Sequence, residues 1–267
     1  MLKDITLGQY FPGNTIVHRL DPRTKIIMVA IYIACIFTAG NYISYSCVII
    51  FLVSSVALSR ISPKTLLRGL RPLIFIISLT AVINLFYTPG TELVRFGIFK
   101  ITYEGIKNSV FMVLRITMLI MGTFLLTYTT SPIALTDGLE LLMGPLKKIR
   151  VPVHELSMMM SIALRFIPTL IEETDKIMSA QKARGASFDT GKLTERAKAL
   201  LPLLVPLFVS AFGRADELAV AMESRCYHGG EGRTRMKQLK MHGIDAAALS
   251  LGLLLLAGVI VMAVFNI

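Results

Sequence analysis

Long uncharged apolar blocks alternate with short basic loops along this chain. The first block, residues 26–59, contains no charged residue. As a single helix it would be about 50 Å long, more than the roughly 30 Å of a bilayer's hydrocarbon core. Gly40 and Asn41 near its middle favour a turn. The pattern therefore predicts two membrane spans, over about 26–39 and 43–59.

Three further apolar blocks predict three more spans, at about 72–88, 108–128 and 246–265. Pro89 and Gly90 end the first of them, because neither residue favours continuation of a helix. The sequence thus predicts an all-α, polytopic membrane protein with about five transmembrane helices.

The segments between the spans also carry local signals. Asp21 can cap a helix whose first residue is Pro22. The loop 60–71 has four basic and no acidic residues, and its Ser62-Pro63 pair favours a short helix at the membrane surface. Segment 91–104 mixes β-branched, aromatic and turn residues, which predicts an external hairpin or loop.

The region 129–243 is the least apolar part of the chain. After Ser131-Pro132 it predicts an amphipathic helix whose leucines share one face (Leu135, Leu139, Leu142 and Leu146). Two long helical runs follow, and each ends in an arginine followed by helix-breaking residues. When the runs are superposed on Arg184 and Arg225, two further pairs match: Asp175 with Asp216, and Ala180 with Ala221. The pattern indicates a weak internal repeat.

The ends of these two runs carry the predicted function. A helix end leaves carbonyl groups unpaired, so an arginine is favourable there. Gly185 can adopt the left-handed conformation that ends the first helix. Because Cys226 lacks that freedom, we expect the second helix to end later, at Gly229-Gly230. Either the arginines only compensate their helix ends, or they dock with carbonyls or carboxylates of another protein.

Composition excludes several classes of protein. The chain is 54% hydrophobic, has a mean hydropathy of +0.66 and carries a net charge of +11. Because the basic residues lie between apolar blocks, they indicate membrane loops and no nucleic-acid partner. There is no phosphate-binding Gly-Lys-Ser/Thr loop, so we expect no ATP hydrolysis by this chain. Its three cysteines have neither disulfide nor metal spacing, and we expect no cofactor and no metal.

Charge distribution predicts the orientation. With five spans, the N-terminal tail, loop 60–71 and region 129–243 share one side and hold 24 of the 28 Lys and Arg residues. The positive-inside rule places that side in the cytoplasm and the C-terminus outside. Residues 1–25 contain no uninterrupted apolar core and no cleavage site, so no signal peptide is expected.

Two other functional classes have to be weighed. A self-contained secondary carrier would need paired charges within the membrane, and Arg115 is the one ionisable residue well inside a span. We expect Arg115 to contact a carbonyl or a neighbouring helix, or to extend its side chain toward a membrane interface. An enzyme acting on a lipid would need clustered carboxylates or histidines, but the four histidines are isolated in sequence. We interpret the acidic run 172–175 as a solvated helix face. Met158–Met160 are interpreted as packing residues, and the alternative is a sliding surface for interchangeable partners.

The chain resembles the transmembrane T component of energy-coupling factor (ECF) transporters. The resemblance covers nearly the whole chain and is most specific in three motifs: HRLDPRTK at 18–25, QKARGASF at 181–188 and FGRADELAVAMESRCYHGG at 212–230. It implies two cytoplasmic coupling helices that cross as an X. It also implies that Ala183-Arg184-Gly185 and Ser224-Arg225-Cys226 dock into two ATPase subunits, although only the arginine of the second triplet matches the Ala-Arg-Gly pattern.

The resemblance further implies the partners and the division of the chain. The partners would be two ABC-type ATPase subunits, as a homo- or heterodimer, and a small membrane S component that binds a vitamin or another micronutrient. The chain would be a non-catalytic subunit in the bacterial cell membrane. It would comprise N-terminal transmembrane helices (1–128), a coupling-helix region (129–243) and a C-terminal transmembrane helix (244–267).

Overall fold

The computed structural model describes residues 10–96, 99–186, 193–229 and 238–265. Residues 1–9, the first part of the segment behind the signal-peptide expectation, lie outside this part. The end of the second motif, residues 187–188, lies outside it as well. The chain forms two compact units. The bundle unit comprises Gly8–Gly138 and Leu239–Ile267, and the arm unit is built on Leu139–Gln238. The predicted three-part division stays a prediction.

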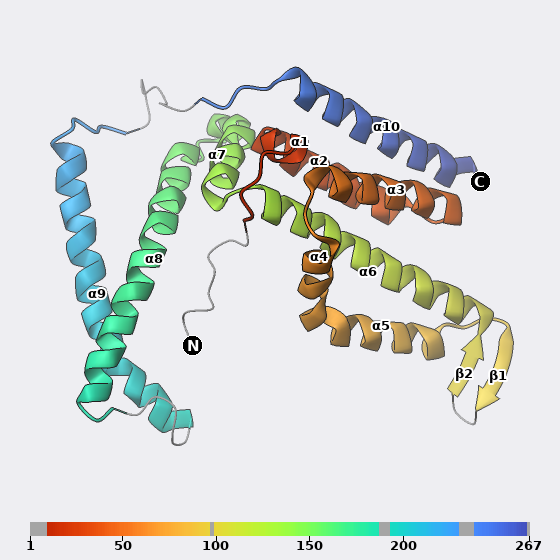
Figure 1. Cartoon of the computed structure of the whole chain (residues 1–267), viewed down its shortest axis with the longest axis horizontal. Coiled ribbons are helices and arrows are strands. Elements are labelled where there is room, and N and C mark those ends of the chain that lie inside the picture. Colours follow the sequence, from red (N-terminus) through yellow and green to blue (C-terminus); the bar gives the residue numbers. More distant parts are fainter. Residues whose placement is uncertain (1–9, 97–98, 187–192, 230–237, 266–267) are drawn as a thin grey trace. The chain divides into compact units, whose positions relative to one another are not determined.

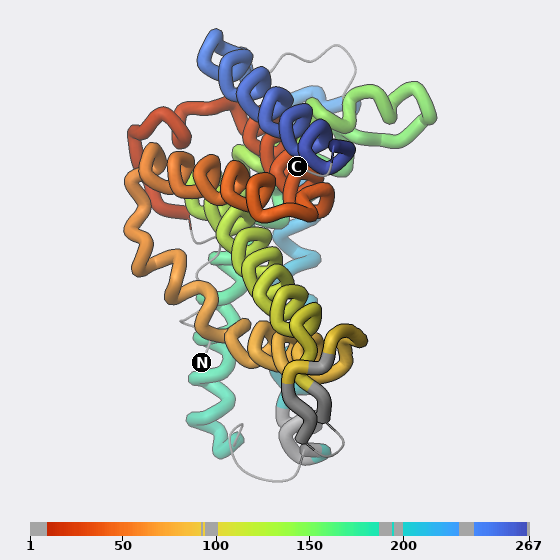
Figure 2. The backbone as a smooth tube through the Cα atoms, turned by 90° about the vertical axis from the view of Figure 1, so that its right-hand side faces the viewer, coloured from red at the N-terminus to blue at the C-terminus, as the bar shows by residue number. Residues whose placement is uncertain are grey.

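The bundle unit is helical except for one hairpin (Figure 1). Its helices are α1 (Ile16–Arg19), α2 (Pro22–Thr38), α3 (Tyr42–Ser59), α4 (Pro63–Leu70), α5 (Ile74–Tyr87), α6 (Tyr103–Thr129) and α10 (Gly243–Phe265), with a short 3-10 turn η2 (Arg71–Leu73) before α5. Figure 2 shows α10 and α6 on opposite sides of the α2–α3 pair. Helix α10, last in sequence, therefore packs against the first long helix.

Four helices in the described part of the chain are long and apolar enough to cross a membrane: Tyr42–Ser59, Pro63–Tyr87, Tyr103–Thr129 and Gly243–Phe265. The second combines α4, η2 and α5. The remaining predicted span corresponds to α2, which has 17 residues and is one residue shorter than α3. The all-α polytopic fold is confirmed, and the predicted count of about five is close.

The buried core lies where α2, α3, α6 and α10 meet. Its members are mostly apolar (Tyr32, Cys35, Ile36, Ala39, Tyr45, Val48, Leu52, Met118 and Val259). The Tyr32 hydroxyl is satisfied because it donates to the Met118 carbonyl over 3.0 Å. Gly122 lets α6 approach this ring, since a Cβ there would lie 2.3 Å from a Tyr32 ring carbon.

Arg115 of α6 has the structural role that we expected. Its Nε donates to the Tyr45 hydroxyl over 3.0 Å, and a terminal nitrogen donates to the Ala39 carbonyl over 3.4 Å. Its guanidinium also lies 6.0 Å from the centre of the Phe37 ring. Arg115 thus links α6 to α2 and α3, and this accounts for a charge inside a span.

Several predicted boundaries are confirmed. Helix α2 starts at Pro22, and the Asp21 side chain accepts from the Arg23 amide over 2.9 Å. Helix α4 starts at Pro63, although Ser62 makes no side-chain cap bond. Of the two predicted alternatives for segment 91–104, a hairpin or a loop, the hairpin forms: β1 (Glu92–Phe96) pairs with β2 (Phe99–Thr102) in antiparallel orientation.

The arm unit contains the end of α7 (Pro132–Leu142), the 3-10 helix η3 (Gly144–Ile149), and the long helices α8 (Val153–Ala183) and α9 (Leu193–Glu223). Helices α8 and α9 have 31 residues each, which corresponds to about 46 Å. They contact one another and cross in the view of Figure 1. Pro168 lies inside α8, and Pro202 and Pro206 lie inside α9, so each long run stays helical through its prolines.

Candidate functional site

Helix α8 ends in a closed hydrogen-bonded cap. Gly185 has a φ of +90° and donates its amide to the Lys182 carbonyl over 3.0 Å. The Ala186 amide reaches back to the Gln181 carbonyl, also over 3.0 Å. This pair of bonds is the Schellman motif, in which a left-handed residue turns the chain away from the helix axis. It places Arg184 at the last position before the turn.

Helix α9 ends in the same cap, and this corrects our expectation for its end. The helix ends at Glu223, without continuing to Gly229-Gly230. Cys226 adopts the left-handed conformation with a φ of 57°. Its amide donates to the Glu223 carbonyl over 2.9 Å, and the Tyr227 amide donates to the Met222 carbonyl over 3.1 Å. Cysteine thus takes the place of glycine, because the two cap bonds offset its conformational cost.

The predicted site residues lie at these two ends, one triplet on each helix. Ala183, Arg184 and Gly185 are exposed, and so are Ser224, Arg225 and Cys226. Within the described residues, no side-chain hydrogen bond or ion pair engages the guanidinium of Arg184 or Arg225. Each tip therefore presents five N–H donors in a planar fork, which matches carboxylates and carbonyl groups.

An ion pair joins the two helices at matching positions. Arg214 of α9 donates to the carboxylate of Glu173 of α8. The two residues are 41 positions apart, the same offset that separates Arg184 from Arg225. Each tip arginine follows the ion-pair residue of its own helix by about three turns. The acidic run 172–175 is therefore not only a solvated face, because Glu173 is part of the link between the helices.

The long helices also expose many apolar side chains. On α9 these are Leu200, Leu201, Leu204, Val205, Phe208, Val209, Phe212 and Val220, and on α8 they are Leu156, Met159 and Met160. Val205, Phe208, Val209 and Phe212 are each at least 60% exposed. A patch of this kind marks a surface that contacts lipid or another protein. Met159 and Met160, which we expected to be packing residues, belong to this exposed set.

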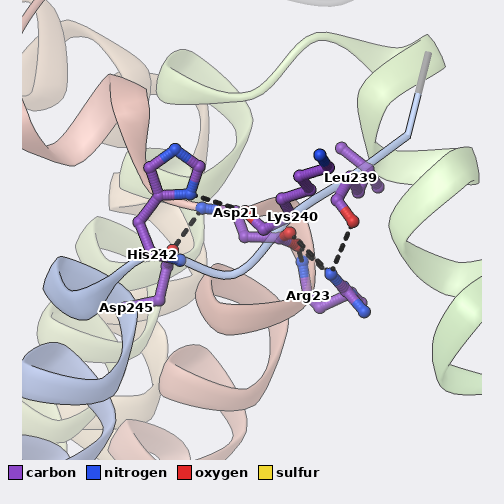
Figure 3. Close-up of polar contacts among 6 residues, drawn as sticks. All are labelled: Asp21, Arg23, Leu239, Lys240, His242 and Asp245. Carbon is purple, nitrogen blue, oxygen red and sulfur yellow. Dashed lines mark hydrogen bonds and ion pairs between the residues drawn. The ribbon is translucent and has the colours of Figure 1, made fainter.

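The 18–25 motif and Asp245 form a polar lock in the bundle unit, which we define as Asp21, Arg23, Lys25 and Asp245. Figure 3 shows its members Asp21, Arg23 and Asp245. The Asp245 carboxylate is 2% exposed and accepts from the amides of Asp21 and His242, each over 2.8 Å. It thereby holds the N-terminal ends of α2 and α10 together. The role of Asp245 was not predicted from the sequence, because its partner Asp21 lies 224 positions away.

Arg23 and Lys25 complete the polar lock. The Arg23 guanidinium binds the Asp21 carboxylate over 2.9 and 3.0 Å and donates to the Leu239 carbonyl over 3.2 Å. The bonds from Arg23 hold the pKa of Asp21 below its usual value. Lys25 donates to the His18 carbonyl over 3.1 Å and to the Thr129 carbonyl over 2.9 Å. The motif thus ties α1, α2, α6 and α10 together at one end of the bundle unit.

The histidines form no cluster in the described structure. His154 pairs with Glu140 over 3.1 Å and joins α8 to the end of α7. His18 contacts Thr15 and the Phe11 carbonyl, and His242 contacts the Lys240 carbonyl. Among the residues described, no group of three histidine, cysteine or acidic side chains has metal-binding geometry.

Comparison with known proteins identifies the family. The model of the CbiQ family, described as cobalt transport protein, matches residues 13–236. The chain belongs to this family. It is 58% identical to the energy-coupling factor transporter transmembrane protein EcfT of Thermosediminibacter oceani, over 92% of this chain and 93% of that protein. It is 52% identical to the EcfT of Ruminiclostridium cellulolyticum over 98% of each chain, and 49% identical to that of Bacillus subtilis over 93% and 94%.

These relatives confirm the predicted class of protein. This CbiQ-family chain is a transmembrane component of an energy-coupling factor transporter, and it works in a complex with other subunits. It is a non-catalytic membrane subunit of that transporter.

Proposed function

We propose that this chain couples two ABC-type ATPase subunits to a small membrane S component in an ATP-driven importer of a vitamin or another micronutrient. One ATPase subunit docks on Ala183-Arg184-Gly185, and the other docks on Ser224-Arg225-Cys226. The observation that carries the proposal is the shared geometry of the tips. The same cap bonds and the same left-handed residue follow each arginine, despite the different sequences.

A matched pair of tips suits a matched pair of docking sites. An ATPase homo- or heterodimer offers two equivalent or nearly equivalent surfaces, so two equal caps can bind it in the same way. The planar fork of arginine suits bidentate docking with carboxylates or carbonyls. The S component carries the transported compound and sets the substrate, and this chain holds the S component.

Because α8 and α9 cross, a movement of their arginine tips can be transmitted along both helices. When the ATPase subunits close, they bring their docked tips together and change the angle between α8 and α9. Rigid-body motion of packed helices is an established mode of transmission. The exposed apolar side chains of α9 are the surface on which we place the S component, which topples as the angle changes. The Phe208 and Phe212 rings, 60% and 67% exposed, offer large contacts there.

The charge pattern supports a particular orientation in the bacterial cell membrane. The N-terminal tail, the 60–71 loop and the coupling helices face the cytoplasm, and the C-terminus lies outside. This places both arginine tips on the side where ATP is available.

Replacing both arginines tests the proposal. In Arg184→Ala/Arg225→Ala, we expect ATP-driven uptake to be abolished and the ATPase pair to be lost on purification, while the S component is retained. Each single variant removes one charged contact at an interface, which typically costs about 2–5 kcal/mol, or more than tenfold in affinity. Lysine should rescue poorly because it lacks the planar fork.

The matched control is Arg165→Ala, which removes an exposed arginine of α8 before the crossing region. This variant should transport normally. If the double variant assembles with its ATPases and transports at the normal rate, the arginines only compensate their helix ends and the proposal is wrong.

A further inference from the structure

An apolar cavity of about 310 Å³ lies in the bundle unit beside the polar lock. Five helices line it: α1, α2, α3, α6 and α10. Its lining residues are almost all apolar, and Met28, Leu52, Leu125 and Ala248 are typical of them. A cavity of this size and character is suited to an apolar ligand.

The mouth of the cavity is apolar as well. Four lining residues from three helices (α1, α3 and α10) are each more than half exposed: Ile16 (53%), Leu58 (52%), Ile244 (52%) and Leu251 (57%). In a membrane protein, side chains of this kind face acyl chains. The cavity is therefore reached from the hydrocarbon region of the bilayer, which favours a lipid over a water-soluble ligand.

A cationic group lines the same cavity. Lys25 is only 6% exposed, and its ammonium group carries three N–H donors. Two of them bind the carbonyls of His18 and Thr129. No third acceptor for Lys25 is found among the described residues. One donor is thus left for a ligand at the polar end of an otherwise apolar cavity.

The exposed charges next to the lining residues are also basic. Arg19 precedes the lining residue Leu20, Arg60 follows Leu58 by two positions, and both arginines are exposed. The acidic residues Asp21 and Asp245 are buried and already bind backbone amides within the polar lock. This end of the bundle therefore offers positive charge to a ligand that arrives along the membrane surface.

We propose that the cavity binds one acyl chain of an anionic phospholipid. The chain occupies the apolar volume, Lys25 donates to the ester or phosphate oxygens, and Arg19 and Arg60 attract the headgroup. The bound lipid fills the space between α1 and α10 and stabilises the end of the bundle that the polar lock holds together.

The test uses the full chain in nanodiscs of phosphatidylethanolamine and phosphatidylglycerol at three to one. The probe is phosphatidylglycerol with a photoactivatable diazirine on one acyl chain, and labelled residues are mapped by mass spectrometry. We expect labelling to concentrate on cavity residues such as Met28 and Leu125. Ser55→Phe/Ala248→Phe, which fills the cavity from α3 and α10, should reduce that labelling at least fivefold.

Three comparisons complete the test. Ala246→Phe places one phenylalanine at an exposed position of α10 outside the cavity lining and should leave the labelling unchanged. If the double variant fails to fold, the milder substitution Ala248→Leu replaces it. Ala248→Leu should reduce the labelling of the cavity residues about twofold. Arg19→Gln/Arg60→Gln should remove the preference for phosphatidylglycerol over an equal phosphatidylcholine probe, whereas Lys64→Gln/Arg68→Gln on α4 should not.

Two results would overturn the inference. Labelling spread evenly over the lipid-facing helices, and unchanged by filling the cavity, would show that no acyl chain occupies it. Equal labelling by the phosphatidylcholine probe in the unmodified chain would show that the headgroup is not selected. Neither readout involves transport or ATPase docking, so the proposed function is tested separately.

Discussion

Cys226 holds a backbone conformation that glycine adopts at the corresponding position of α8. A residue with a Cβ typically loses about 1–2 kcal/mol in the left-handed region. The cap bonds of Cys226 and Tyr227 offset this cost. That the tip keeps this shape despite the conformational penalty agrees with the docking role that we propose for it.

The penalty can be measured by substitution. Cys226→Gly should stabilise the tip of α9 by about 0.5–1 kcal/mol, because glycine adopts a φ of 57° freely. Hydrogen exchange of the Tyr227 amide should slow about two- to fivefold. Gly185→Ala should make hydrogen exchange of the Ala186 amide faster, because alanine adopts a φ of +90° only at a cost. Ser224→Gly is the control, since Ser224 does not have a positive φ and gains nothing. Faster exchange in Cys226→Gly would contradict this account.

Single residues differed in how far the sequence revealed them. Arg115 was predictable because a charge inside an apolar span must find a carbonyl or hydroxyl, and it binds both. The arginine tips were visible because each arginine precedes helix-breaking residues. The end of α9 was predicted wrongly, because residue preference alone cannot weigh cap bonds against a strained φ. Asp245 was missed because its role depends on a partner 224 positions away.

At the scale of elements, the pairing of α8 and α9 depends on contacts that a helical pattern does not reveal. Glu173 and Arg214 are each about one quarter exposed, with side-chain values of 23% and 29%. Ion pairs that solvent reaches contribute about 0–1 kcal/mol. This pair therefore adds little to stability, and its value lies in fixing which turns of the two helices meet.

A double-mutant cycle separates these two roles. We expect the Glu173→Ala and Arg214→Ala variants to couple by only about 0.2–1 kcal/mol in unfolding measurements. The charge swap Glu173→Arg/Arg214→Glu should restore transport that either single variant lowers. Glu172→Ala paired with Arg214→Ala is the matched control, because Glu172 is exposed and adjacent. Equal coupling for Glu172 would show a general charge effect in place of a specific contact.

Element types were predictable where length and charge are decisive. The apolar blocks gave the long helices, and the turn residues of 91–104 gave the hairpin. Boundaries were less accurate where a cap decides them. Helix α6 starts at Tyr103, five residues before the predicted span, because the Thr102 hydroxyl accepts from the Gly105 amide. Pattern reasoning located the apolar part of that helix and omitted its polar first turn.

At the scale of the whole molecule, the distribution of charge predicts the orientation of the chain in the membrane, on which the proposed function depends. The three regions predicted to share the cytoplasmic side hold 24 of the 28 Lys and Arg residues. The proposed docking of ATPase subunits requires Arg184 and Arg225 to lie on that side. Orientation and coupling are therefore linked, because a chain inserted the other way would present Arg184 and Arg225 to a compartment without ATP.

Cysteine labelling in intact cells tests this orientation. In a background of Cys35→Ala, Cys47→Ala and Cys226→Gly, Leu93→Cys in β1 should react with an impermeant thiol reagent from outside, since Leu93 is 57% exposed. Asn266→Cys, beyond the described residues, should react likewise. Lys176→Cys on the exposed face of α8 should react only after the membrane is permeabilised. Reaction of Lys176→Cys in intact cells would reverse the orientation and, with it, the assignment of the two arginine tips to an ATPase pair.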